Sequence, residues 1–203
     1  MRLQYNFIRF QLKNILHIYT FLLLLFFSYQ GHAQENEVRT FYDPDQNQIK
    51  EVYIAHNGIK DGPYSYYYET GQLWQKGNFK DNNLDGQWKI YYKNGPLEKT
   101  ITYSKGKKDG PFEYYYPNGQ IMQEGRYKNE TYQDTVYSYY ETGNIMELSF
   151  YVLGIKQGLS TGYYENGNVL YKLQFIDNNQ SGICELYYPN GILKERARKL
   201  NGM

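Results

Sequence analysis

Few side chains in this sequence are of the kinds that catalyse reactions. Cys184 is the single cysteine, and His56 is the single histidine outside the first 33 residues. A catalytic triad or a multi-histidine metal site would have to be built on His56, which adjoins a predicted turn and has no triad partner near it in sequence. Cys184 occupies a mainly apolar position of the repeat described below, which predicts a buried thiol rather than a nucleophile. We therefore expect that the protein is not an enzyme.

Two segments begin like a calcium-binding loop. Residues 81–86 and, more weakly, 177–182 place oxygen-bearing side chains at alternate positions before a glycine, as an EF-hand loop does. The last position of such a loop needs a bidentate glutamate, but Tyr92 and Tyr188 stand there. Polar residues before glycine are also ordinary turn chemistry. We interpret both segments as turns and predict no metal and no cofactor.

One short motif, Tyr-Tyr-x-x-Gly, recurs through most of the chain at a constant spacing of 24 residues. A fixed period in this range is typical of stacked repeat architectures. An apolar residue follows each glycine by two positions, and an aromatic residue follows in most copies. Phe41-Tyr42-Asp43-Pro44 is interpreted as a divergent first copy, one or two residues out of phase. The first tyrosines of the six regular copies are Tyr67, Tyr91, Tyr115, Tyr139, Tyr163 and Tyr187.

The repeat predicts an all-β fold. Each unit contains two glycine-marked turns separated by runs rich in tyrosine, phenylalanine, isoleucine and valine, which favour strands. Glycine or proline returns about every 12 residues, which leaves no room for an ordinary helix. We therefore predict a single elongated antiparallel β-meander of about seven hairpins. The structural turn glycines are Gly62, Gly71, Gly86, Gly95, Gly110, Gly119, Gly143, Gly158, Gly167, Gly182 and Gly191, and Asp134 fills the gap in the series.

Strand alternation sends the two tyrosines of each pair to opposite faces of the sheet. One ladder is expected on a packed face with Tyr64, Trp88 and Phe112, and the other on a wetter face with Ser65 and Lys89. The ladder that starts at Tyr67 is the candidate binding surface. Regularly spaced aromatic rings can hold a partner protein, can stack against sugar rings of a cell-surface glycan, or can simply stabilise cross-strand pairs. These three interpretations stay open.

The N-terminal segment has the features of an export signal. Basic residues precede an apolar run from Ile15 to Phe27, and Gly31 and Ala33 supply the small residues that a signal peptidase requires. The run is shorter than the roughly 18 residues that span a bilayer. We expect residues 1–33 to be a cleaved signal helix, 34–40 a linker and 41–203 the repeat array. The protein is then exported to the periplasm, to the cell surface or into the medium.

The charge balance limits the partners. The sequence contains 22 basic and 21 acidic residues, and loss of Arg2, Arg9 and Lys13 with the leader leaves 19 basic residues against 21 acidic ones. Nucleic-acid binding requires a concentrated positive field, and adsorption to anionic lipid requires clusters of lysine and arginine. We therefore expect no nucleic-acid partner and no membrane contact after the signal is removed.

The pattern of Tyr-Tyr-x-Asn-Gly, an aliphatic residue two positions later and a closing Asp-Gly resembles the MORN repeat, and more closely the bacterial MORN variant repeat of the YwqK family. The resemblance covers about residues 41–203. It implies a scaffold for protein contacts, in some members with membrane contacts. The YwqK grouping also implies an antitoxin-like binding role in the cytoplasm, whereas the leader predicts export.

Overall fold

The computed structural model describes residues 35–200, and the predicted signal helix lies outside this part of the chain. The described residues form β-strands joined by short turns, without a helix among them. The strands are β1 (Glu35–Phe41), β2 (Ile49–His56), β3 (Ile59–Tyr67), β4 (Leu73–Lys80), β5 (Asn83–Tyr91), β6 (Leu97–Ser104), β7 (Lys107–Tyr115), β8 (Ile121–Lys128), β9 (Thr131–Tyr139), β10 (Ile145–Val152), β11 (Ile155–Tyr163), β12 (Val169–Ile176), β13 (Asn179–Tyr187) and β14 (Leu193–Lys199).

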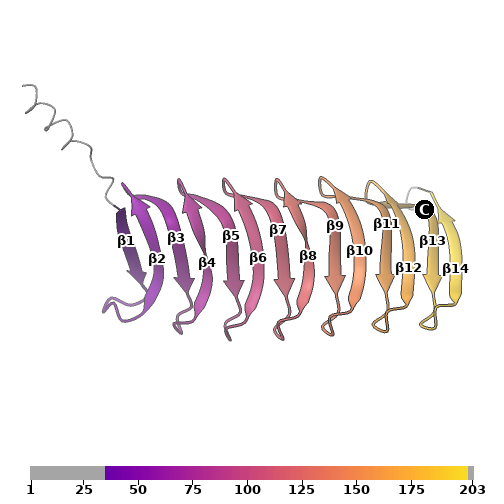
Figure 1. The fold of residues 1–203 in the computed structure, drawn as a ribbon, viewed down its shortest axis with the longest axis horizontal. Helices are drawn as coiled ribbons and strands as arrows, with labels where there is room; N and C mark the ends of the chain where they lie inside the picture. Colours follow the sequence, from indigo (N-terminus) through magenta and orange to yellow (C-terminus); the bar gives the residue numbers. More distant parts are fainter. Residues whose placement is uncertain (1–34, 201–203) are drawn as a thin grey trace, which may run out of the picture. The chain divides into compact units, whose positions relative to one another are not determined.

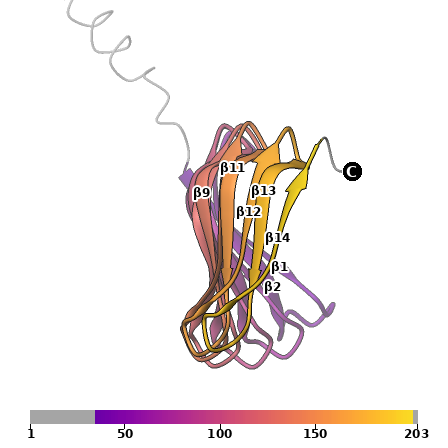
Figure 2. The ribbon, with the colours of Figure 1, turned by 90° about the vertical axis from the view of Figure 1, so that its right-hand side faces the viewer.

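All fourteen strands belong to one sheet, and each strand pairs with the strands before and after it in the chain (Figure 1). The strand pairs from β2 to β14 are antiparallel, so the predicted all-β meander of hairpins is confirmed. Figure 2 shows these strands as one curved layer when the sheet is viewed from its end. Over residues 35–200 there is no helix of the length and apolarity that a membrane crossing needs.

Two kinds of turn alternate along the sheet. Inside the β3–β4 hairpin, the Gly71 amide donates to the carbonyl of Tyr68 at 2.8 Å, and Gly71 has a φ of 86°. Between hairpins, a two-residue turn connects β4 to β5 through Asp81 and Asn82, whose φ values are 48° and 61°. Positive φ at both central residues defines the turn that matches the twist of antiparallel strands, and asparagine and aspartate tolerate it.

The sequence predicts a second turn ending at Gly62, Gly86, Gly110, Gly158 and Gly182, and this placement is wrong. These glycines lie inside strands, and Gly86, for example, belongs to β5 beside a shift of register against β4. The shift marks a β-bulge, an extra residue that also requires positive φ. Gly86 has a φ of 70°, and Asp134, at the equivalent position of β9, has a φ of 65°. Because turns and bulges need the same backbone conformation, Asp-Gly alone does not distinguish them.

The predicted linker is also wrong over most of its length, since residues 35–40 form β1 together with Phe41. The divergent first copy therefore has its own first strand, as every other hairpin does. The Tyr42 hydroxyl donates to the carbonyl of Tyr67, which makes Tyr42 equivalent to the second tyrosine of the later pairs. Phe41 is then equivalent to Tyr67, in agreement with the predicted phase shift of one or two residues.

One face of the sheet, called the packed face, carries the apolar core. Its central column consists of one residue from each of the six hairpins between β3 and β14, and all six are buried: Tyr64, Trp88, Phe112, Val136, Ser160 and Cys184. The buried state of Cys184 agrees with the prediction. Around Phe112, the residues Ile101, Tyr127 and Val136 form the buried cluster, and the ring centroids of Phe112 and Tyr127 lie 4.7 Å apart.

Glycines between the large rings make this packing possible in a single layer. Gly77 is the cross-strand neighbour of Tyr64. A Cβ atom added to Gly77 would lie 2.4 Å from the indole of Trp88, so the ring occupies the space that a side chain would need. Gly125 has the same relation to Phe112, at 3.0 Å. At Gly77 and Gly125, the absence of a side chain therefore lets a large ring cover the backbone of a neighbouring strand.

Candidate functional site

The second tyrosine of each pair links one hairpin to the next. These tyrosines follow the strand end, and their hydroxyls donate to the carbonyl oxygen of the first tyrosine in the next unit at 2.7–2.9 Å. The donors are Tyr68, Tyr92, Tyr116, Tyr140 and Tyr164. Tyr42 makes the same bond to Tyr67 at 2.7 Å. This column therefore has a structural role: it ties each turn to the end of the next hairpin's first strand.

The first tyrosines, from Tyr67 to Tyr187, lie on the opposite face, called the tyrosine face. All six are half-buried, and they share this face with Ser65 and Lys89, as the sequence predicts. Tyr139 donates to Glu124 at 2.5 Å and Tyr187 to Glu185 at 2.6 Å, and Tyr115 donates to Glu113. Three of the six hydroxyls are thus held by carboxylates of the same sheet.

The environment of the three carboxylate-bound tyrosines, Tyr115, Tyr139 and Tyr187, raises their pKa. Burial, and then the hydrogen bond to Glu113, raises the pKa of Tyr115 to about 12. For Tyr187 the hydrogen bond to Glu185 is the main cause of a raised pKa. Since a carboxylate accepts a hydrogen bond from the phenol and repels the phenolate, the neutral form is favoured in both cases. The hydroxyls of Tyr115 and Tyr187 therefore stay protonated, and the six rings of the ladder are partly covered.

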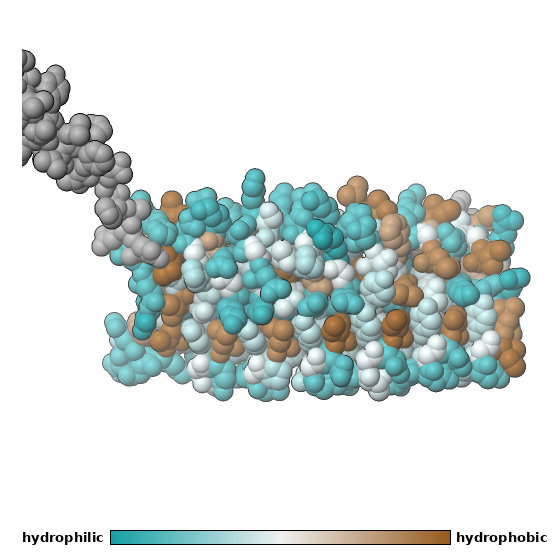
Figure 3. Space-filling model, viewed as in Figure 1, coloured by the Kyte–Doolittle hydropathy of each residue, from teal (hydrophilic) through white to brown (hydrophobic). Residues whose placement is uncertain are grey.

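Exposed apolar side chains gather elsewhere on the tyrosine face, over β10 to β13. Each follows or precedes a packed-face residue along its strand and so points to the opposite side. We call these six residues the apolar patch; their exposed fractions run from 39% to 55%, and they are Phe150, Val152, Ile155, Leu159, Ile176 and Ile183. Figure 3 shows hydrophobic residues gathered over the upper part of the sheet at the end that carries these strands.

The equivalent positions of earlier hairpins mostly carry polar residues or proline. In the column of Leu159, the earlier residues are Pro63, Gln87, Pro111 and Thr135, and in that of Phe150 they include Asn78, Thr102 and Arg126. The apolar patch is therefore a local property of the last hairpins and not a requirement of the repeat. The constant positions of the repeat, on which the sequence prediction rests, do not reveal it. The patch becomes visible when the variable positions of one hairpin are compared with the equivalent positions of the others.

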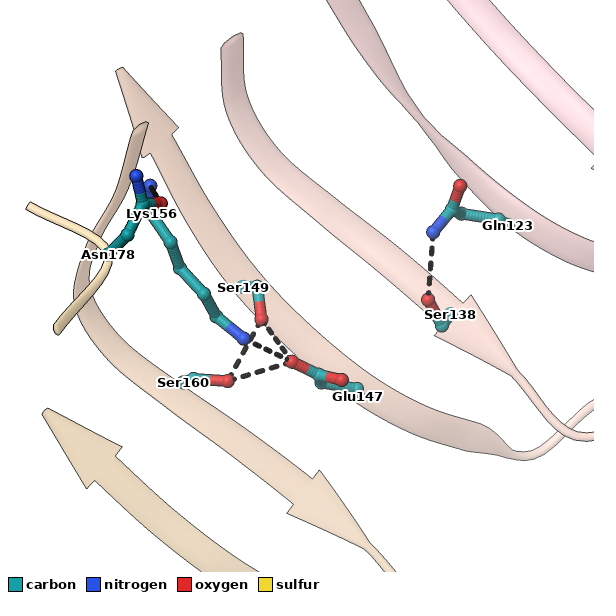
Figure 4. A network of polar contacts seen from close by, with 7 residues as sticks. All are labelled: Gln123, Ser138, Glu147, Ser149, Lys156, Ser160 and Asn178. Carbon is teal, nitrogen blue, oxygen red and sulfur yellow. Dashed lines mark hydrogen bonds and ion pairs between the residues drawn. The ribbon is translucent and has the colours of Figure 1, made fainter. Parts of the chain in front are cut away.

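A polar cluster lies on the packed face where the aromatic core ends (Figure 4). The Glu147 carboxylate receives hydrogen bonds from Lys156 at 2.7 Å, from Ser160 at 2.9 Å and from Ser149. The two serine hydroxyls lie 2.9 Å apart. Burial alone would raise the pKa of Glu147, but the hydrogen bonds from Lys156 and the serines outweigh it, so the pKa is lowered. The charges of Glu147 and Lys156 neutralise each other, and these polar contacts replace apolar packing in this unit.

The first hairpins contain a simpler version of the same arrangement. Glu51 accepts hydrogen bonds from Lys60 at 3.1 Å and from the Tyr64 hydroxyl at 2.9 Å. Lys60 and Lys156 occupy the same repeat position, as do Tyr64 and Ser160. A glutamate–lysine pair on the packed face is thus a structural device that recurs along the array. Neither cluster contains a histidine or a cysteine.

The side chains of residues 35–200 that could ligate a metal do not converge. Asp81 and Asn82 form a two-residue turn, while Asn83 and Asp85 lie in β5. Asp61 and Asp109 form ion pairs with Lys80 and Lys128, at 3.1 Å and 2.9 Å. Over residues 35–200, no three His, Cys, Asp or Glu side chains lie together in a group that could hold a metal ion.

Comparison with protein families finds a match to this chain. A model described as "MORN repeat variant" matches six consecutive stretches, residues 60–81, 84–105, 108–129, 135–152, 156–177 and 180–198. The stretches follow the hairpins from β3 to β14 one by one. A search of curated proteins found no match to this chain.

Proposed function

Because this chain belongs to the MORN repeat variant family, we propose that it is an exported, non-enzymatic scaffold that holds another protein against its tyrosine face. The apolar patch supports this proposal most strongly. Contiguous exposed apolar surface is uncommon on monomeric proteins and marks sites of protein or ligand contact. The repeat itself does not require apolar residues there, as Gln87 and Arg126 at equivalent positions demonstrate.

The form of the patch suits an extended or flat partner surface. Its residues come from four neighbouring strands of one sheet. Leu159 and Ile183 occupy the same repeat position two strands apart, so their side chains project from the sheet in the same way. A partner that buries these side chains gains about 25 cal/mol for each Å² of apolar surface removed from water. On the same face, the half-buried first tyrosines add aromatic rings that each carry a polar hydroxyl.

A retention experiment tests this proposal. Purified protein immobilised on beads is incubated with envelope extract of the source cells, and the retained proteins are quantified. We expect Leu159→Lys combined with Ile183→Lys to reduce retention of the partner at least tenfold, because two ammonium groups would have to be desolvated in the contact. Gln87→Lys, at the position equivalent to Leu159, is the matched control and should retain the partner fully. Unchanged retention by the double variant contradicts the proposal.

A glycan array distinguishes the carbohydrate alternative. If the ladder of first tyrosines binds sugar rings, the wild-type protein retains a glycan, and Tyr67→Ala with Tyr91→Ala and Tyr115→Ala loses it. We expect no glycan whose retention depends on these tyrosines.

Export is tested separately from binding. We propose that the leader is removed after Ala33, so that the purified mature protein begins at Gln34. Mass spectrometry of protein recovered from the envelope or the medium gives the N-terminus directly. A chain that still begins at Met1, or that stays in the cytoplasm, contradicts export and leaves the binding proposal to be judged on its own test.

A further inference from the structure

The last tyrosine of the array differs from its equivalents. From Tyr42 to Tyr164, the second tyrosine of each unit donates to a carbonyl of the next unit. Tyr188 holds the same position in the last hairpin, but β14 is the final strand of the sheet and no further unit follows it within residues 35–200. Its side chain is 47% exposed, whereas the equivalent tyrosines before it are half-buried. Within residues 35–200, the array therefore ends in an exposed tyrosine that has no further unit to which its hydroxyl could donate.

The first strand offers the acceptor. Phe41 is equivalent to Tyr67, and no tyrosine among residues 35–200 donates to its carbonyl oxygen. The outer edge of β1 pairs with no other described strand. Next to Phe41, the hydroxyl of Thr40 is buried and has no hydrogen-bond partner in the described part of the chain. One end thus carries a donor without an acceptor, and the other carries an equivalent acceptor without a donor.

The register inside the array shows how the two ends would meet. In the β4–β5 pair, Gln75 lies opposite Ile90, and Lys76 lies opposite Lys89. The equivalent residues are Glu195 and Arg196 of β14 and Thr40 and Arg39 of β1. This register places the Glu195 carboxylate opposite the unpartnered hydroxyl of Thr40.

The charges of the two edges are complementary at the next position. Asn78 and Gln87 line the same shallow hollow on the tyrosine face. Their equivalents are Arg198 of β14 and Glu37 of β1, both exposed. The like charges of Arg196 and Arg39 are already paired within each chain, with Glu185 at 2.5 Å and with Glu37 at 2.6 Å. Lys76 and Lys89 show that the array accepts a like-charged pair at this position.

From these observations we propose that the chain binds a second copy of itself end to end, with β14 of one molecule pairing with β1 of the next. The Tyr188 hydroxyl then donates to the carbonyl of Phe41 in the neighbouring copy, and the meander continues without interruption. This head-to-tail contact does not close on itself, so it produces linear oligomers. A single strand edge is smaller than a standard interface, so we expect the association to be weak. The size of the oligomers therefore depends on the protein concentration. The proposal does not depend on the apolar patch.

Mixing of charge-reversed variants tests the proposed register. We expect sedimentation velocity of the purified protein to show oligomers that grow with concentration. Glu37→Arg alone and Arg198→Glu alone should each lower the association constant at least tenfold, because each places like charges opposite one another. An equimolar mixture should restore association, since the arginine introduced at position 37 of one variant then meets the glutamate introduced at position 198 of the other. A wild-type protein that stays monomeric at every concentration overturns the proposal, as does a mixture that stays dissociated.

The hydroxyl of Tyr188 provides a second test with an internal control. Tyr188→Phe should weaken association about two- to tenfold, the range expected for one hydrogen bond, and should leave the monomer's unfolding midpoint unchanged. Tyr164→Phe removes an equivalent bond inside the array, so it should lower the unfolding midpoint and leave association unchanged. Leu159→Lys should leave association unchanged, which separates this contact from the proposed partner site. Equal association of Tyr188→Phe and wild-type protein overturns the proposed bond.

Discussion

The hydroxyl of Tyr92 donates to the carbonyl oxygen of Tyr115 at 2.7 Å, from the turn of one hairpin to the end of the first strand of the next. The bond connects residues 23 positions apart and recurs in every hairpin that has a successor among the described residues. Each unit is therefore coupled to its neighbours by strand pairing, by ring packing and by this hydroxyl. Such nearest-neighbour coupling is the basis of stability in repeat proteins.

The inter-unit hydrogen bond can be removed with little change of shape. We expect Tyr92→Phe to lower the free energy of unfolding by about 0.5–1.5 kcal/mol, because the carbonyl of Tyr115 loses a partner in a partly buried place. Urea denaturation followed by circular dichroism measures the change. Tyr188→Phe in the monomer is the matched control and should show no change. A Tyr92→Phe variant as stable as the wild-type protein would show that this hydrogen bond does not stabilise the fold.

The close approach of Gly77 to Trp88 predicts a steric cost. Gly77→Ala places a methyl group in the space of the indole, and Trp88 must move from its buried position. We expect a loss of about 1–3 kcal/mol, the range for overpacking in a core, together with a change in the near-ultraviolet circular dichroism of the tryptophan. Gly125→Ala, where the nearest atom lies at 3.0 Å, should cost less. A larger loss of stability in Gly125→Ala than in Gly77→Ala would contradict the packing described for the central column.

The bulge glycines predict strain that stays local. Gly110 has a φ of 137°, and a Cβ atom there would lie 2.8 Å from Thr102. Gly110→Val should cost about 1–3 kcal/mol through backbone strain, and more than Gly86→Val, because Gly86 has open space around it. Hydrogen exchange should show loosening of β6 to β8 and unchanged protection in distant hairpins. Uniform loosening of the whole sheet would contradict coupling between nearest neighbours.

The Glu147 cluster predicts a sensitivity to acid. The pKa of Glu147 is lowered in the folded protein, so its carboxylate stabilises the fold above the ordinary glutamate pKa of 4.5, and this contribution is lost as the pH falls below it. We expect Glu147→Gln to destabilise the protein at neutral pH, with a difference from wild type that shrinks on acidification. Glu165→Gln, in an exposed turn, is the control. A difference that does not depend on pH would mean that the charge of Glu147 contributes nothing to stability.

Much of the fold follows from the sequence because the period fixes it. The spacing of Tyr67, Tyr91 and Tyr115 sets the length of a hairpin, and alternation then assigns Tyr64 and Ser65 to opposite faces. The bulge at Gly86 could not be distinguished from a turn, since both need positive φ. The linker prediction failed at β1 because a polar edge strand such as residues 35–41 lacks the apolar pattern that identifies a strand facing a core.

The candidate site was harder to predict than the fold. The ladder from Tyr67 to Tyr187 attracts attention because it is constant, yet positions that repeat in every unit mainly serve the repeat itself. The hydroxyl of Tyr68, for example, donates a hydrogen bond to the carbonyl oxygen of Tyr91 in the next unit. The apolar patch is visible in sequence as a departure at Phe150, Leu159 and Ile183 from the polar residues and prolines of earlier units. That these departures gather on one face depends on the register of β10 to β13, which the structure supplies.

Photocrosslinking in the source cells tests most directly whether the apolar patch is where a partner protein binds. A photoreactive amino acid is placed at position 159 in one variant and at position 87, which is equivalent in the repeat, in a second variant. We predict that irradiation yields a discrete protein adduct from position 159 and none from position 87. The same adduct from both positions, or no adduct from position 159, would contradict the proposed function.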